Sequence, residues 1–162
     1  MITLDWGRVS RKFPTWDDHG DAQHIFRAMK SRLPIYDQAI TALIEDLVER
    51  GLDKRVLVIA TGEFGRTPKV NMGRAKTPLW PGRDHWPGAM SVLIAGGGLN
   101  MGQVIGQTNQ KGEYPADRTL DPNDLVATVY RFLGINPEAT LLDHRGRPLP
   151  LLPYGKAIEE LS

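Results

Sequence analysis

The sequence predicts one α/β domain in which helices cover both faces of a mostly parallel sheet. Two continuous apolar runs, 56–60 and 91–95, each lead into glycine-containing segments, and such runs are typical of strands buried on both faces. Amphipathic helical patterns stand before the first run and after the second. This order of strands and helices predicts a three-layer α/β/α fold over residues 1–162.

The N-terminal half supplies a strand, a long helix and the two central strands. Residues 1–6 alternate between apolar and polar side chains, which predicts a strand. Helical spacing of apolar residues predicts helix over 25–48, which Gly51 is suited to end. Strands at 55–61 and 91–96 are expected to be neighbours in the sheet. The apolar stripe of the helix, expected to be buried against that sheet, consists of Tyr36, Ile40, Leu43, Ile44, Leu47 and Val48.

The C-terminal half contains one further helix between loop-rich segments. Residues 103–106 are a candidate short strand or hairpin arm. Asp121, followed by a proline, is a strong N-cap for a helix that Gly134 would end. The tail at 140–149 predicts a turn and a last short strand. The buried face of the helix is expected to comprise Leu125, Val126, Val129, Tyr130, Phe132 and Leu133.

Composition excludes several classes of protein. The apolar fraction of 41% and the charged fraction of 24% are those of a globular domain. A net charge of +1 gives no electrostatic basis for binding nucleic acid. The absence of cysteine excludes disulfides, thiolate metal sites and a cysteine nucleophile. No apolar run is long enough for a membrane span, and no signal peptide begins the chain, so the compartment stays open.

Carboxylates and imidazoles gather in the loops beside the predicted strands. Asp17 and His19 suit a divalent metal ion, although the same segment would also fit a solvated turn that caps the next helix. His85 could be a metal ligand supported by the carboxylate of Asp84, or it could simply anchor its loop. The remaining histidines, His24 and His144, are expected on the surface.

Glu63 and Arg66 follow the first apolar run directly. They could line a ligand site at the sheet edge, where α/β proteins collect functional groups, or they could form an ion pair that closes the turn. Three consecutive glycines, 96–98, are interpreted as a tight exit from the second strand. None of the serines stands in the sequence context of a catalytic nucleophile; they are Ser10, Ser31, Ser91 and Ser162.

Several of these motifs together resemble a bacterial family. They are Trp-Asp-x-His-Gly, Gly-Glu-Phe-Gly-Arg-Thr-Pro, Gly-Arg-Asp-His-Trp-Pro, Gly-Gly-Gly and Gly-Glu-Tyr-Pro. They resemble domain-of-unknown-function family 1501, placed in the alkaline phosphatase-like and sulfatase superfamily, over nearly the whole chain. The resemblance implies a two-metal site that acts on phosphate or sulfate esters.

The resemblance assigns roles residue by residue. Asp17 and His19 match the middle ligand pair of the superfamily, Glu63 stands in place of a ligand aspartate, and His85 matches the late histidine. The implied cofactor is a divalent metal ion, whether zinc, manganese or calcium. Arg66 would bind an oxygen of a small anionic ester.

The superfamily's first aspartate and its nucleophile would lie upstream of residue 1. The chain is therefore expected to be the C-terminal part of a longer domain, with an open sheet edge through which it could self-associate. Two hypotheses follow. One is a metal-dependent hydrolase of phosphate or sulfate esters, or a fragment of one, and the other is a non-catalytic domain that binds a metal or an anion.

Overall fold

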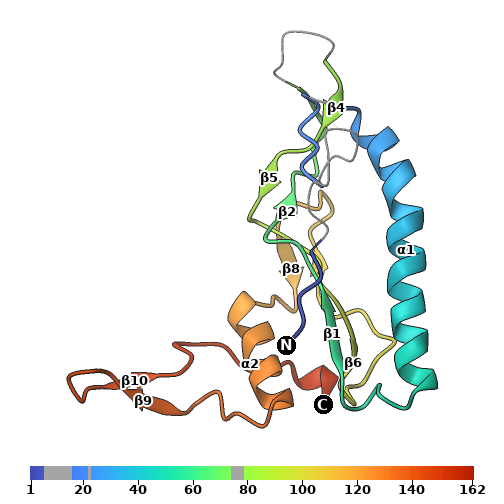
Figure 1. Cartoon of the computed structure of the whole chain (residues 1–162). Coiled ribbons are helices and arrows are strands. Elements are labelled where there is room, and N and C mark those ends of the chain that lie inside the picture. The colour runs from blue at the N-terminus through green and yellow to red at the C-terminus, as the bar shows by residue number, and fades with distance from the viewer. Residues whose placement is uncertain (6–15, 22, 74–78) are drawn as a thin grey trace. The chain divides into compact units, whose positions relative to one another are not determined.

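The computed structural model describes residues 1–5, 16–21, 23–73 and 79–162 (Figure 1). In this part of the chain, the α-helices are α1 (Ile25–Glu49) and α2 (Pro122–Phe132), and each sheet consists of two antiparallel strands. The prediction of a three-layer α/β/α fold with a mostly parallel sheet is therefore wrong.

Two compact units make up the chain. The first unit comprises 1–41 and 63–90, and the second comprises 42–62 and 91–162. The expectation that residues 1–162 form one domain stays a prediction.

The first unit is built from the N-terminal part of α1 and two small antiparallel ladders. Strand β2 (Gly65–Arg66) pairs with β5 (His85–Trp86), and β3 (Asn71–Met72) pairs with β4 (Pro81–Gly82). These strands lie between the predicted strands 55–61 and 91–96, where the sequence predicts no strand. Two-residue strands carry no periodic signal.

A glycine contact fixes the segment before α1 against β4. A Cβ atom added at Gly82 would lie 2.0 Å from the carbonyl carbon of His19, so only glycine permits this approach of two backbones. The backbone hydrogen bond from Arg83 N to Asp18 O, 2.9 Å, lies beside this contact. The segment that carries Asp17 and His19 is thereby held next to the strand pair that carries His85.

Helix α1 ends as its sequence predicts. Gly51 has a φ of +66°, its amide donates to Val48 O, and the amide of Leu52 donates to Leu47 O. These two bonds define a Schellman motif, which requires the positive φ that glycine adopts without strain. The helix continues through Pro34.

The apolar stripe of α1 is less buried than the sequence predicted. Among its six residues Val48 is exposed and the others are half-buried. The side chains of α1 that are buried are Ile25, Ala28 and Arg32. Each sheet in the described part of the chain has only two strands, so the large sheet expected to cover this stripe is not formed there.

The second unit contains the two strands that the sequence predicts as neighbours in a central sheet. Strand β1 (Leu57–Ala60) and β6 (Leu93–Gly96) are neighbours, as expected, but they run antiparallel, with Leu57 opposite Gly96. A parallel pair would need a connection that crosses back along the strand. Both strands are mostly half-buried, not buried on both faces.

The glycines after β6 make the expected tight exit. Gly96, Gly97 and Gly98 all have positive φ, and a Cβ at Gly96 would lie 2.4 Å from Val56 O. A side chain there would collide with the backbone just before the neighbouring strand β1.

Helix α2 begins and ends at its predicted signals. Asp121 caps the first turn by accepting from Asn123 N, and the side chain of Asp124 accepts from Asp121 N in return. Gly134 has a φ of +73° and ends the helix. The buried residues of α2 are Ala127 and Thr128, whereas most of the predicted apolar face is half-buried and Leu133 is exposed.

Two hairpin-like ladders and a short 3₁₀ helix complete this unit. Strand β7 (Gln107–Thr108) pairs with β8 (Pro115–Asp117), and β9 (Thr140–Leu142) pairs with β10 (Pro148–Pro150); the 3₁₀ helix is Glu159–Leu161. The candidate strand at 103–106 thus begins instead at Gln107.

The predicted N-terminal strand is not formed. Residues 1–5 belong to no strand, and Trp6 lies outside the described residues. Neither described α-helix is long and apolar enough to cross a membrane.

Candidate functional site

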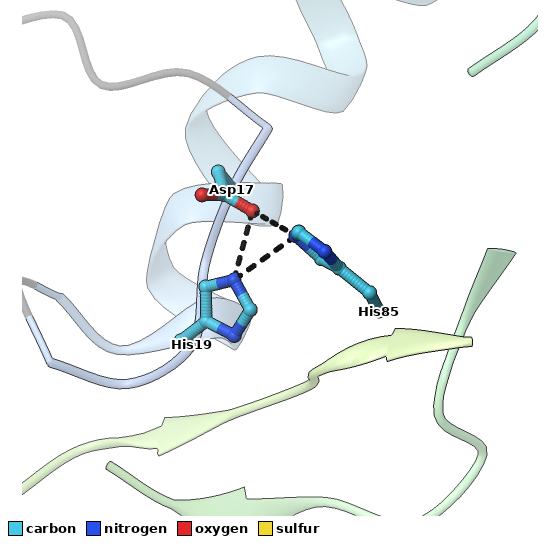
Figure 2. A group of neighbouring side chains, drawn as sticks. All are labelled: Asp17, His19 and His85. Carbon is cyan, nitrogen blue, oxygen red and sulfur yellow. Dashed lines mark hydrogen bonds and ion pairs between the residues drawn. The ribbon is translucent and has the colours of Figure 1, made fainter. Parts of the chain in front are cut away.

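Asp17, His19 and His85 meet at one point of the first unit (Figure 2). The Asp17 Oδ1 atom lies 2.9 Å from His19 Nε2 and 2.9 Å from His85 Nε2, and the two imidazole nitrogens are 3.2 Å apart. Each of the three residues thus offers one atom that could bind a metal ion, and these three atoms all lie within 4.8 Å of one another. The three residues predicted to share a metal ion are therefore brought together, and their role as ligands stays a prediction.

The neighbouring carboxylate, Asp18, anchors the segment that carries two of these residues. Its side chain is 2% exposed, and Arg32 of α1 donates to it at 2.6 and 3.1 Å. Gln23 donates to the same carboxylate. Because both partners of the Asp18–Arg32 pair are buried and bidentate, the pair fixes the segment firmly to the helix.

His85 is placed by the β2–β5 ladder. In that ladder His85 lies opposite Arg66, and the Phe64 ring lies against the imidazole with centroids 4.2 Å apart. The ladder therefore brings an imidazole and a guanidinium to the same side of the cluster.

Asp84 orients His19, not the adjacent His85. The Asp84 Oδ1 atom lies 2.8 Å from His19 Nδ1, and Asp84 Oδ2 accepts from the side-chain amide of Asn71 at 3.0 Å. The amide nitrogen of Asp84 donates to Thr67 Oγ1. Adjacency in sequence suggests support of His85, but the observed contact joins Asp84 to Nδ1 of His19, a residue 65 positions away.

Arg66 binds the cluster itself. Its guanidinium donates to Asp17 Oδ1 at 2.6 Å and to the backbone oxygens of Trp16 and Arg83, each at 3.2 Å. These bonds hold the guanidinium beside the cluster and neutralise the Asp17 carboxylate. The proposed role of Arg66 on an anionic oxygen remains untested.

The charges of the cluster shift two pKa values in opposite directions. Hydrogen bonds from Arg66 and, secondarily, His85 hold the pKa of Asp17 well below its ordinary value of 3.8. The hydrogen bond to Asp84 raises the pKa of His19 above its ordinary value of 6.5, with a smaller contribution from Asp17. The cluster thus keeps Asp17 ionised and favours a proton on His19.

The other predicted residues lie elsewhere or differ in burial. Glu63 is exposed and is not part of the convergent group. His144 is exposed, as expected, but His24 is half-buried against the rings of Phe26 and Trp80. The turn-closing pair between Glu63 and Arg66 is replaced by the pair between Arg66 and Asp17.

An open cavity of about 360 Å³ lies beside the cluster. Its lining residues, all from the first unit, are His19, Asp21, Met72, Asp84 and His85. This volume is in the range of small-molecule sites.

The sequence matches the family described as protein of unknown function (DUF1501) over residues 1–162. The chain belongs to this family, as its motifs had suggested. No curated protein and no solved structure matches the chain significantly.

Proposed function

We propose that the chain binds one divalent metal ion through Asp17, His19 and His85, and that this centre serves the hydrolysis of a phosphate or sulfate ester. The observation that carries the proposal is the convergence of one carboxylate oxygen and two imidazole nitrogens on a common point beside a cavity.

The donor set supports a transition metal over calcium. Two imidazoles and a carboxylate are the ligands of many three-residue zinc sites, whereas calcium takes six to eight oxygens. Ligands of a tetrahedral zinc ion lie roughly 3.3 Å from one another. The separations of 2.9, 2.9 and 3.2 Å among Asp17, His19 and His85 are close to that spacing.

Three protein ligands leave a coordination position open, which distinguishes catalytic from purely structural zinc sites. Bound there, the ion would act as a Lewis acid toward an anionic ester and would make water more acidic. Arg66 keeps Asp17 ionised and in place, and Asp18 anchors the backbone between the ligands to α1. The choice of phosphate and sulfate esters comes from the resemblance to the alkaline phosphatase-like superfamily.

A second candidate is a non-catalytic metal-binding domain. The described side chains that line the cavity carry no hydroxyl or thiol group that could act as a nucleophile. This observation favours metal binding without covalent catalysis, and on this second candidate the chain gives no turnover of aryl phosphate or aryl sulfate.

Calorimetric titration with Zn²⁺ tests the centre directly. The wild-type chain should take up one ion, and His19→Ala and His85→Ala should each abolish stoichiometric uptake. His144→Ala is the matched control, since His144 is exposed and outside the cluster, and it should bind normally. Uptake that survives both cluster variants would disprove the centre.

Turnover then separates the two candidates. Hydrolysis of aryl phosphate or aryl sulfate that disappears in His85→Ala would support the hydrolase. Stoichiometric metal uptake without turnover would support the non-catalytic domain.

A further inference from the structure

Asp84 contacts the candidate ligand His19 but is not part of the cluster of Asp17, His19 and His85. Its Oδ1 atom is 2.8 Å from His19 Nδ1, on the opposite side of the ring from the nitrogen that faces Asp17 and His85. The carboxylate is itself held, because Asn71 donates to its other oxygen at 3.0 Å. The backbone on both sides is fixed, since Thr67 N donates to Asp84 O and Asp84 N donates to Thr67 Oγ1.

This contact decides which nitrogen of His19 carries the hydrogen. An ionised carboxylate only accepts hydrogen bonds, so the nitrogen that faces Asp84 must donate. In the neutral imidazole the hydrogen then resides on Nδ1, and Nε2 carries the lone pair.

A competing carboxylate, Asp17, lies near Nε2 at 2.9 Å, and it would favour the other tautomer. However, the Asp17 Oδ1 atom already accepts from the Arg66 guanidinium at 2.6 Å and lies 2.9 Å from His85 Nε2. These two groups weaken the pull of Asp17 on a hydrogen at Nε2. A guanidinium nitrogen of Arg66 also lies 3.4 Å from Nε2, and because a guanidinium only donates, this contact favours a lone pair on Nε2 and the hydrogen on Nδ1 beside Asp84.

We propose that Asp84 is a positioning residue of the metal centre. It holds His19 as the Nδ1–H tautomer, so that Nε2 presents its lone pair at the point shared with Asp17 and His85, and Asn71 in turn orients Asp84. The inference rests on the proposed function, because metal binding is what requires a lone pair on Nε2. Removing a carboxylate that supports a metal-bound histidine in this way typically lowers metal affinity about 10–100-fold.

The tautomer is measured on the full metal-free chain by long-range ¹H–¹⁵N NMR of the imidazoles, at a pH where His19 is neutral. Wild-type His19 should show the Nδ1–H pattern. Asp84→Ala should shift His19 toward the Nε2–H tautomer and should weaken Zn²⁺ binding about 10–100-fold by calorimetry. A purely structural role of Asp84 would lower stability without changing the tautomer.

Two further variants keep the test decisive. Asn71→Ala retains the carboxylate but frees it to rotate, so it should give a smaller shift in the same direction, and it serves if Asp84→Ala does not fold. Asp46→Ala removes a carboxylate that pairs with Arg50, and it should leave both the tautomer and the affinity unchanged.

The outcomes separate this inference from the proposed function. An Nε2–H pattern in the wild type, or a tautomer that neither Asp84→Ala nor Asn71→Ala changes, would overturn the positioning role of Asp84. A wild-type chain that takes up no Zn²⁺ would overturn the metal centre, and the tautomer measurement would still report whether Asp84 fixes His19.

Discussion

Asp17, Asp18 and His19 are consecutive residues with different surroundings. Asp17 and His19 face the cluster, whereas Asp18 is buried against Arg32. The buried pair explains why the segment can hold two candidate ligands in place although it belongs to neither helix nor strand. Asp18 thus helps to hold the site although it lies outside the cluster.

We expect Arg32→Leu to destabilise the chain by about 3–5 kcal/mol, because it leaves the Asp18 carboxylate buried without its charged partner. Urea unfolding monitored by circular dichroism measures the loss. The control is Arg50→Leu, which removes the exposed partner of Asp46 just after the same helix and should cost under about 1 kcal/mol. Equal losses in the two variants would contradict the anchoring role of the buried pair.

Arg66→Met should raise the pKa of Asp17 toward its ordinary value of 3.8, because it removes the largest cause of the lowering. A lowered carboxyl pKa stabilises the folded state above the ordinary value, and this contribution is lost as the pH falls below 3.8 toward the folded-state pKa. The variant should therefore lose less stability than wild type over that acidic range. Carboxyl ¹³C NMR titration measures the pKa, and an unchanged value would refute the assignment of Arg66.

The sequence identified the members of the cluster but not the contacts among them. Asp17, His19 and His85 were grouped by residue type and order, and the structure brings them together. Asp84 was assigned to its sequence neighbour, because the pattern of residues does not show that the chain folds His19 against Asp84 from 65 positions away. The Asp18–Arg32 pair went unnoticed, since an ion pair across 14 positions leaves no periodic signal.

At the scale of elements, the sequence predicts the helix ends correctly but not the direction in which the central strands pair. The helix ends at Gly51, Asp121 and Gly134 were predicted because each depends on a few adjacent residues. The direction in which β1 and β6 pair depends on the path of the whole chain between them. Apolar runs alone could not distinguish a parallel central pair from the antiparallel pair observed.

Gly82→Ala should greatly weaken or abolish Zn²⁺ uptake, because its Cβ would collide with the backbone of His19 and push β4 away from the cluster. The matched control is Gly51→Ala, which introduces a side chain at positive φ with no atom within 4 Å. That control should lose about 1 kcal/mol of stability and keep its metal uptake. Normal uptake by Gly82→Ala would show that the glycine contact does not hold the site.

At the scale of the whole molecule, the core is small. Among the described residues, six hydrophobic side chains are buried, and three of them are alanines. Large apolar side chains remain exposed, including Leu142 at 72% and Val104 at 95%. Strands β9 and β10 are exposed throughout. Since apolar burial is the main favourable term in folding, this chain should have little stability in reserve.

We therefore expect the isolated chain to be marginally stable or to self-associate, because association would cover apolar side chains that its own core leaves in water. Size-exclusion chromatography with light scattering gives the mass, and thermal unfolding gives the cooperativity. A clean monomer with a sharp transition at high temperature would contradict this expectation and would support one well-packed domain.

The distance along the chain between the candidate ligands has a consequence for folding. Asp17 and His85 are 68 positions apart, and the ladders beside them are only two residues long. An ion shared by these side chains would be a removable cross-link, in a chain that has no cysteine to form a permanent one. Metal binding to the cluster and folding of the first unit would then be coupled. The folded fraction of this unit would rise with the concentration of free metal.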